Sequence, residues 1–189
     1  MRIAEVSRET KETKIFVRIN LDGSGVAEVE TTIPFLDHLL KTISVHSLID
    51  VKVRAEGDLK HHIIEDVAIC LGKAINKALG ERKNIKRFGY AVIPMDDSLA
   101  FSAIDLVRRP YAKIDFGFKG FVEGVLADDL RHFIEVLAYY MQATIHIRVE
   151  YGINPHHMIE SAFKALAISL RQALSAEEKR ETLSAKGVM

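Results

Sequence analysis

Two copies of one short motif contain most of the side chains that could bind a metal ion. The first copy is HHIIE at residues 61–65, and the second, 95 residues later, is HHMIE at residues 156–160. A single histidine precedes each pair at a similar distance, His38 by 23 residues and His132 by 24. We therefore predict an internal duplication that pairs six of the eight histidines.

Helical geometry determines what each copy of the motif can chelate. Positions four apart lie on one face of a helix, whereas neighbours are rotated by roughly 100°. The first histidine and the glutamate of each copy can therefore bind one ion, while the second histidine points toward another centre. With the upstream histidines, the predicted ligands suffice for two ions, each with about four protein ligands: His38, His61, His62, Glu65, His132, His156, His157 and Glu160.

The ligand types restrict the metal without selecting one. Imidazoles and carboxylates with open octahedral positions suit manganese or iron, and they also accept zinc. Histidine at a helix start can instead cap the helix or pack, but two matching copies favour metal ligation over this structural interpretation. His46 and His146 lie outside the repeat. His146 alternates along a predicted strand as a packed or supporting residue, whereas His46 could reach the site.

Cationic side chains differ between the two copies. Lys164 stands four residues after Glu160, where the first copy has Ile69. An ammonium beside metal ligands is costly unless an anion or a leaving group needs it, although a solvated helix lysine is an equally good interpretation. Further cations in segments that are not repeated could together form one phosphate pocket: Arg87, Arg109 and Lys186.

Composition excludes several classes of protein. The 189 residues are 48% hydrophobic, which is typical of a soluble globular chain with a proper core, as one domain or two fused halves. Lysine plus arginine equals aspartate plus glutamate at 26 each, so no overall charge attracts nucleic acid or an anionic membrane. The single Cys70, expected to be buried and inert, and the lack of a signal peptide or membrane span predict a cytoplasmic protein.

Hydrophobic periodicity predicts an α+β fold in which both halves have the order strand, strand, helix, strand, helix. In the first half we expect a strand at 13–21 and its hairpin partner at 26–32, a helix at 35–47, a strand at 51–55 and a helix that Gly80 ends. A short strand near 88–93 precedes the second half, with strands at 98–107 and 111–116, a glycine-rich loop, a helix at 127–142, a strand at 145–150 and a helix at 156–174. The halves are assigned as 1–95 and 96–189, the latter with a charged tail.

These residues resemble a known family, imidazoleglycerol-phosphate dehydratase of histidine biosynthesis. The resemblance extends from about residue 12 to residue 187. One departure is the segment GDLK at 57–60, which is three residues shorter than in the family pattern. The motifs that carry the resemblance are FLDH at 35–38, HHxxED at 61–66, RFG at 87–89, RPY at 109–111, HF at 132–133 and HHxxExxFKA at 156–165.

The resemblance implies a fold, a reaction and roles for particular residues. The fold is a duplicated α+β unit, ribosomal protein S5 domain 2-like, with two Mn²⁺ ions per active site, sites shared between subunits and a homo-oligomer of 24 subunits built from trimers. The reaction removes water from imidazoleglycerol phosphate to give imidazole acetol phosphate. Glu12 and Glu160 are the implied proton acceptors and Lys164 lies near the substrate oxygens. The implied substrate and phosphate ligands are Arg87, Arg109, Ser184, Lys186 and His46.

Two other classes of function remain open from the residues alone. The same histidines could serve a metal-binding or storage protein without catalysis, and small α+β units also occur in nucleic-acid-binding proteins. The neutral composition argues against nucleic acid. A storage protein has no need of the additional cations, so phosphate bound beside the ions would discriminate a catalyst from a store.

Overall fold

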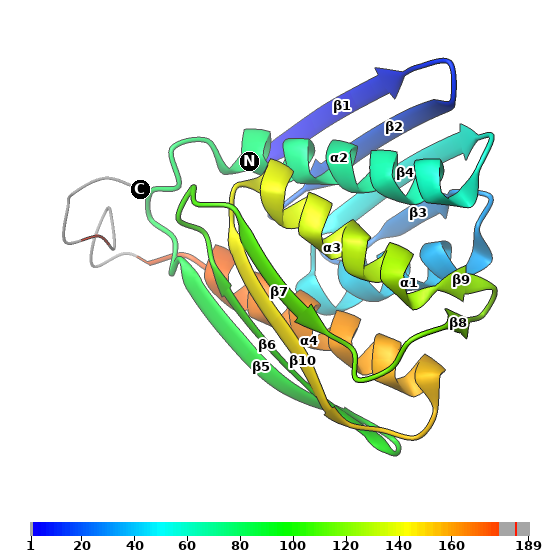
Figure 1. Ribbon diagram of the computed structural model, residues 1–189. Coiled ribbons are helices and arrows are strands. Elements are labelled where there is room, and N and C mark those ends of the chain that lie inside the picture. Colours follow the sequence, from blue (N-terminus) through cyan, green and yellow to red (C-terminus); the bar gives the residue numbers. More distant parts are fainter. Residues whose placement is uncertain (1, 178–183, 185–189) are drawn as a thin grey trace.

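The computed structural model describes residues 2–177 and 184 (Figure 1). The first half contains β1 (Ile3–Glu9), β2 (Thr13–Asn20), β3 (Ala27–Glu30), α1 (Pro34–Ser47), β4 (Asp50–Gly57) and α2 (Lys60–Leu79). The second half contains β5 (Phe88–Met95), β6 (Ser98–Asp105), β7 (Tyr111–Asp115), the short strands β8 (Phe121–Val122) and β9 (Val125–Leu126), α3 (Ala127–Met141), β10 (Thr144–Tyr151) and α4 (Pro155–Leu174).

The same connectivity occurs twice. One sheet has the order β1-β2-β4-β3 and the other β5-β6-β10-β7. In each, the last strand pairs in parallel with its neighbour while the other pairs are antiparallel. The predicted duplication and the α+β class are therefore confirmed. Because the repeat of elements restarts at β5, we propose that the halves meet in the connection 80–87, before the boundary expected at residue 95.

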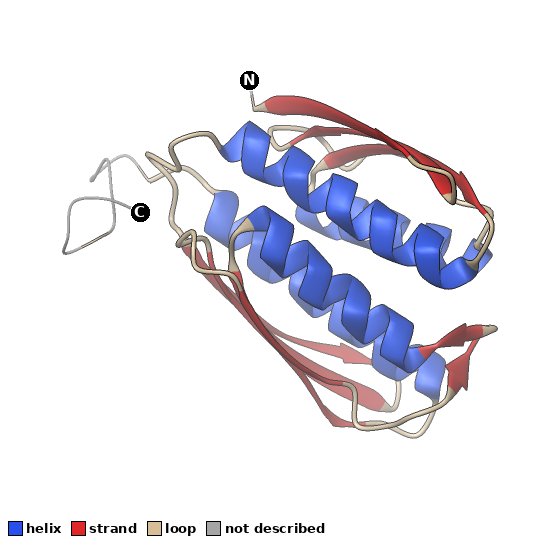
Figure 2. Ribbon diagram, turned by 45° about the horizontal axis from the view of Figure 1, so that its top comes forward, coloured by secondary structure: helices blue, strands red, loops and turns tan. Residues whose placement is uncertain are grey.

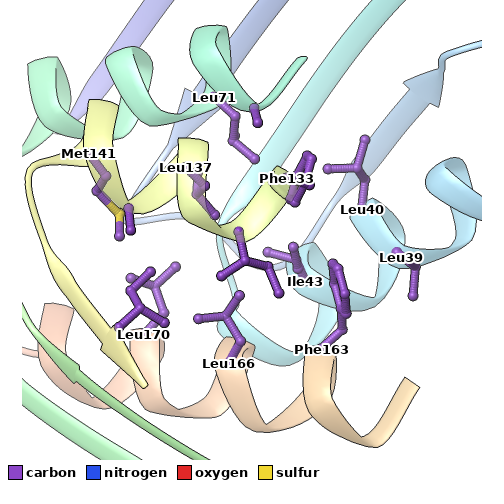
Figure 3. Close-up of a cluster of buried hydrophobic side chains, with 14 of the residues drawn as sticks. Leu39, Leu40, Ile43, Leu71, Phe133, Leu137, Met141, Phe163, Leu166 and Leu170 are labelled. Atoms are coloured by element: carbon purple, nitrogen blue, oxygen red, sulfur yellow. The ribbon is translucent and has the colours of Figure 1, made fainter. Parts of the chain in front are cut away.

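The helices lie between the two sheets, as Figure 2 shows. Helix α2 packs on the first sheet and against α3, and α4 packs on the second sheet and against α1. Alternating residues of the strands, such as Ile15 and Val17 on β2, point inward and are buried. The main core fills the space between the four helices (Figure 3) and includes Leu40, Leu71, Phe133, Leu137, Phe163 and Leu166.

One predicted pairing is wrong. Residues 26–32 were expected to return antiparallel to β2, but β3 pairs in parallel with β4. Both edges of β2 are taken, one by β1 and the other by β4. The carboxylate of Asp50 accepts hydrogen bonds from the backbone N–H groups of Ser24, Gly25 and Val26 at 2.8–3.1 Å, so the turn is held to the start of β4.

Other elements had too weak a local signal to be expected. Strand β1 lies at a sheet edge and Ala4 is its one buried residue, so its hydrophobic alternation is faint. The β8–β9 hairpin lies inside the glycine-rich loop and turns through Glu123 and Gly124, whose φ angles of 47° and 74° are left-handed. A two-residue turn of this kind requires positive φ angles at both residues. Glycine adopts such an angle without steric cost, which explains Gly124.

All four helices begin at the same end of the molecule, opposite the end where the chain enters the first sheet (Figure 1). The predicted ligands occupy the first turns of these helices or the turn that follows. At the start of α4, the side chain of Asn154 accepts a hydrogen bond from the backbone N–H of His156 at 2.9 Å. No helix in the described part of the chain is both long and apolar enough to cross a membrane.

Candidate metal centre

Among the described residues, two groups of ligand-type side chains form at the end of the molecule where the helices begin, and each group combines residues of both halves. His38 of α1 joins His156 and Glu160 of α4, while His132 of α3 joins His61 and Glu65 of α2. Within each group, one ligand atom from every residue lies within 4.8 Å of the others. The crossing follows from packing, because α1 lies against α4 and α2 against α3.

The α4 group is the more buried of the two. Glu160 is buried, and its Oε2 lies 3.2 Å from His156 Nε2 and 3.3 Å from His38 Nε2. In the α2 group, Glu65 Oε1 lies 3.5 Å from His132 Nε2 and Oε2 lies 4.0 Å from His61 Nε2. Both groups therefore present two imidazole nitrogens around one carboxylate, which is a mixed donor set suited to a divalent ion.

The second histidine of each pair points away from these groups. The rings of His61 and His62 are inclined by 64°, and those of His156 and His157 by 88°. His62 lies beside the loop before α2, and His157 lies beside the β5–β6 turn. One chain therefore offers two groups of three donors and two further imidazoles that face other directions.

Carboxylates hold the Nδ1 atoms of four imidazoles. Because a carboxylate only accepts hydrogen bonds, Nδ1 carries the proton and Nε2 remains available to a metal. The sequence interpretation missed these supporting residues, and only the carboxylate of Asp58 carried a local signal, since it precedes His62 by four positions. The Nδ1–oxygen pairs are His61 with Asp129 at 2.9 Å, His62 with Asp58 at 2.7 Å, His156 with Glu123 at 3.2 Å and His157 with Asp97 at 2.5 Å.

Lys164 lies inside the α4 group. Its Nζ is 2.8 Å from Glu160 Oε1 and 3.2 Å from the sulfur of Met95. Burial opposes ionisation of Glu160, but the nearby Lys164 and His38 outweigh it and hold the pKa of this carboxyl below its ordinary value. His46 is half-buried and lies near Lys164. Burial, with a contribution from the Lys164 charge, lowers the pKa of its imidazole.

Glu12 lies in the β1–β2 turn beside the first half's outward imidazole. Its Oε2 is 3.8 Å from His62 Nδ1, and its side chain is 60% exposed. The corresponding turn of the second half carries Asp97 beside His157. Of the predicted proton acceptors, Glu160 thus lies among the ligands and the lysine, whereas Glu12 has a carboxylate that faces solvent.

Two of the predicted phosphate ligands, Arg87 and Arg109, lie at the opposite end of the second sheet. The backbone N–H of Arg87 donates to the carbonyl of Ala173, near the end of α4, about 26 Å from His156 by helix length. The Arg87 guanidinium forms a two-pronged ion pair with Asp105 at 2.7 and 3.0 Å. Arg109 is exposed and its carbonyl accepts a hydrogen bond from Thr144, at the start of β10.

Of the two phosphate ligands predicted in the tail, the structure describes one. Ser184 is described and partly buried, whereas Lys186 lies outside the described residues. Within one described chain, the metal groups and the arginines are therefore far apart. A hollow of about 530 Å³ on the outer face of the first sheet is lined by Arg8, Lys14, Phe16 and Arg54, among others, and by none of the predicted ligands.

Comparison with known proteins gives a consistent result. The family model described as imidazoleglycerol-phosphate dehydratase matches residues 31–170. The chain is 46% identical over 194 residues to the imidazoleglycerol-phosphate dehydratase of Clostridium kluyveri, with 100% of both chains covered. It is 47% identical over 191 residues to that of Dehalococcoides mccartyi, with 100% of this chain and 97% of the other covered.

Solved structures agree with the sequence relatives. The crystal structure of the Pyrococcus furiosus enzyme in complex with (S)-C348 superposes with a TM-score of 0.86 at 39% identity, covering 97% of this chain and 100% of the other. The Staphylococcus aureus imidazoleglycerol-phosphate dehydratase superposes with a TM-score of 0.83 at 29% identity, covering 92% and 99%.

The fold and the site together define a duplicated α+β protein with two symmetry-related groups of histidine and glutamate side chains arranged as metal ligands. The chain belongs to the imidazoleglycerol-phosphate dehydratase family. It is a hydro-lyase that removes water from imidazoleglycerol phosphate in histidine biosynthesis.

Proposed function

We propose that the dehydration depends on two divalent ions, one held by each histidine and glutamate group. The observation that carries this proposal is that two groups of the same composition form across the halves, each with Nε2 atoms facing a carboxylate. The donor set fits a divalent ion because carboxylates keep the proton on Nδ1 of His61 and His156. Manganese is the metal that we propose, since mixed imidazole and carboxylate ligands with open positions suit it.

The full ligand set of this proposal includes the two outward imidazoles, His62 and His157. Asp58 and Asp97 hold Nδ1 of these rings, so that Nε2 lies on the other side of each ring, where His157 Nε2 is 3.5 Å from Asp96 Oδ2. When bound, the ions would supply Lewis-acid stabilisation of developing negative charge on the substrate. The side chains of the protein would bind the substrate, orient it and move its protons.

Proton transfer is divided between the halves in this proposal. The exposed Glu12 carboxylate accepts the proton removed from carbon, because the nearby His62 imidazole is 3.8 Å away and leaves the carboxylate oxygens accessible. The Lys164 ammonium donates a proton to the leaving hydroxyl group in this proposal, and the ion pair with Glu160 at 2.8 Å supports a charged lysine there. Glu160 is the alternative acceptor, but it is already shared by two imidazoles and a lysine.

Phosphate binding requires groups from more than one chain in this proposal. Arg87 and Arg109 lie at the other end of the second sheet from the metal groups, farther than one small substrate extends. Active sites shared between copies would bring both ends together, with Ser184, Lys186 and His46 as further substrate contacts. We extend the proposal to a 24-subunit assembly built from trimers. We also propose a cytoplasmic location. The lone, buried Cys70 suits such a reducing compartment, and burial raises the pKa of its thiol to about 11.

A complementation experiment tests the shared site. Lys164→Met and Arg87→Ala chains are each expected to be inactive as pure assemblies. If the two groups come from different chains, an equal mixture that assembles at random restores about one site in four. Activity that stays at background in verified mixed assemblies would place both groups in one chain's own site and contradict sharing.

Metal dependence is tested separately from assembly. Metal analysis of the purified protein should give about two divalent ions per chain, and chelation should abolish dehydratase activity that Mn²⁺ restores. Inhibition by inorganic phosphate tests the proposed phosphate contacts separately from the ions. Inorganic phosphate should compete with substrate in the proposed enzyme.

A further inference from the structure

The turn that carries Glu12 is held from behind by a buried carboxylate that has no part in the proposed chemistry. We propose that Asp66, acting through the hydroxyls of Thr13 and Thr10, is a positioning residue that fixes the Glu12 turn for proton transfer. This inference rests on the role proposed above for Glu12.

A continuous chain of hydrogen bonds joins Asp66 to the backbone of the turn. The Thr13 hydroxyl donates to Asp66 Oδ2 through a short hydrogen bond, and Thr10 Oγ1 lies 3.2 Å from Thr13 Oγ1. Thr10 Oγ1 also accepts hydrogen bonds from the N–H groups of Glu12 at 3.1 Å and of Thr13 at 3.0 Å. This series of hydrogen bonds therefore ends at the backbone amide of Glu12, the residue whose carboxylate is proposed to accept the proton.

The direction of this chain is determined by its buried end. A carboxylate can only accept hydrogen bonds, so the Thr13 hydroxyl donates its proton to Asp66. Its oxygen can then only accept a hydrogen bond from Thr10. Arg8 donates its Nε–H to the other oxygen of Asp66 at 2.8 Å, which satisfies the charge of a carboxylate that is only 7% exposed. The Thr10 hydroxyl can donate to Thr13 Oγ1 at 3.2 Å or to the Thr13 carbonyl at 3.5 Å, and either hydrogen bond holds Thr10 to Thr13 and restricts the turn.

The loop before α2 holds the turn from its other side. The N–H of Asp58 donates to the carbonyl of Glu12 at 3.0 Å, and Asp58 is also the residue that orients His62. Gly57 permits this approach, since a Cβ there would lie 2.9 Å from the carbonyl oxygen of Glu12. The turn is consequently fixed relative to the same helix start that presents the metal ligands.

The second half shows that the fold does not need a charged network at this joint. Strands β2 and β6 begin at Thr13 and Ser98, and α2 and α4 align so that Asp66 corresponds to Ser161. The Ser98 and Ser161 hydroxyls lie 3.0 Å apart and both are buried, which joins strand and helix with neutral groups alone. Burying Asp66 instead is costly unless something besides folding depends on it.

Proton transfer supplies such a dependence. A general base must lie within hydrogen-bond reach of the proton it removes, and a displacement of about 1 Å can cost roughly 100-fold in rate. Asp97 in the corresponding turn is fixed through its own carboxylate, which accepts from the N–H groups of Ile153 and Asn154. Glu12 needs a free carboxylate, so its turn has to be fixed through the backbone.

The test compares two substitutions of one residue in the full-length, metal-loaded enzyme. Thr13→Val has the same shape but no hydroxyl, and Thr13→Ser keeps the hydroxyl. Thr13→Val should lower kcat by roughly 10- to 100-fold with KM changed less than about two-fold, and Thr13→Ser should restore most of the rate. Bound metal should equal that of the parent, which excludes an indirect effect through Glu65. Ser102→Ala removes a hydroxyl from the buried Ser102–Ser169 pair, away from the turn, and serves as the control for stability.

A substitution in the Glu12→Gln background separates the inference from the proposed function. If Glu12→Gln is inactive and Thr13→Val adds less than about two-fold to it, both hold, because the threonine acts through the glutamate. If Glu12→Gln is inactive but Thr13→Val alone keeps the parent's kcat, the positioning role is overturned and the base survives. If Glu12→Gln keeps the parent's rate, the role of Glu12 fails and the inference falls with it.

A second variant keeps the inference testable if Thr13→Val does not assemble. Thr10 is exposed, so Thr10→Ala leaves the core intact while removing the acceptor for the Glu12 amide. It should lower kcat in the same direction with KM and metal content preserved. A Thr10→Ala enzyme with the parent's kcat would overturn the inference.

Discussion

The two halves share a scaffold for metal ligands but differ in the residues around it. Both supply a histidine pair and a glutamate at one helix start and a single histidine from another helix. Beside these, the second half has Lys164 where the first has the buried, apolar Ile69. In the function proposed above, the symmetric part binds the two ions, and the asymmetric part acts on the substrate, which has no symmetry.

The hairpin turns show the same contrast. The hydrogen bond from His157, with two backbone amides, holds the pKa of Asp97 well below its ordinary value, so this carboxylate is committed to structure. Glu12 occupies the corresponding turn with an exposed carboxylate, and its turn is fixed by the Asp66 network behind it. The two turns therefore occupy equivalent positions, and in our proposal Asp97 supports a metal ligand whereas Glu12 transfers a proton.

Removal of the outward imidazoles should have the largest effect. Because His62 and His157 diverge from the other ligands, we expect His62→Ala with His157→Ala to lose tightly bound metal and all measurable activity. Metal content by elemental analysis and dehydratase assays test this. Retention of two tight ions by the double variant would break the symmetric part of the comparison.

Lys164→Met should leave the metal scaffold intact and remove chemistry. We expect turnover to fall by roughly 10²- to 10⁴-fold, the range for losing a proton donor, with two ions still bound. Lys77→Met, an exposed lysine of α2, is the control and should stay within a few-fold of the parent. If Lys164→Met behaves like the control, Lys164 is only a solvated helix residue.

The two turn carboxylates should respond differently to loss of charge. Glu12→Gln is expected to lower kcat by roughly 10²- to 10⁴-fold without weakening metal binding. Asp97→Asn is expected to weaken metal affinity by roughly 10- to 100-fold, since it supports the His157 ring. Metal titrations alongside steady-state kinetics measure both effects. Equal responses of the two variants would show that the turns have the same role.

The pH dependence of metal binding should be the smallest effect and the same in both halves. Hydrogen bonds to Asp58 and Asp97 raise the pKa of His62 and His157 above the ordinary 6.5, so protons compete with metal already above that pH. Metal affinity should therefore decline as pH falls through this raised value. In the metal-free protein the sign reverses, since these imidazolium contacts stabilise the fold below pH 6.5 and are lost as pH rises.

Metal titrations and thermal unfolding between about pH 5 and pH 8 measure these two opposite trends. A metal affinity that is flat across this range would contradict ligation by His62 and His157. In the Asp58→Asn variant, protons should compete with metal for His62 only at lower pH. Competition at His157 should begin at the same pH as in the parent, because Asp97 is still present.

Several features could be predicted because they depend on neighbours in the chain. The duplication is visible as repeated letters, and the pairing of His61 with Glu65 follows from the four-residue spacing on a helix. Divergence of His61 from His62 follows from the same geometry. The α+β class follows from the alternation of hydrophobic periods.

Other features could not be predicted because distant segments create them. The hairpin expected between β2 and β3 was wrong, since β1 and β4 occupy both edges of β2. Asp129 supports His61 across 68 residues of sequence, so no local pattern announces it. Thr13 and Asp66 likewise meet across 53 positions.

The repeated donor side chains and their direction on each helix could be read from the sequence alone, because the helical repeat ties side-chain direction to spacing. The tertiary structure alone decided which single histidine completes which group. His38 meets His156 and His132 meets His61, although each single histidine lies closer in sequence to the histidine pair of its own half. The physical reason is that α1 packs against α4 and α2 against α3, and helix packing depends on buried surfaces that distant parts of the chain contribute together.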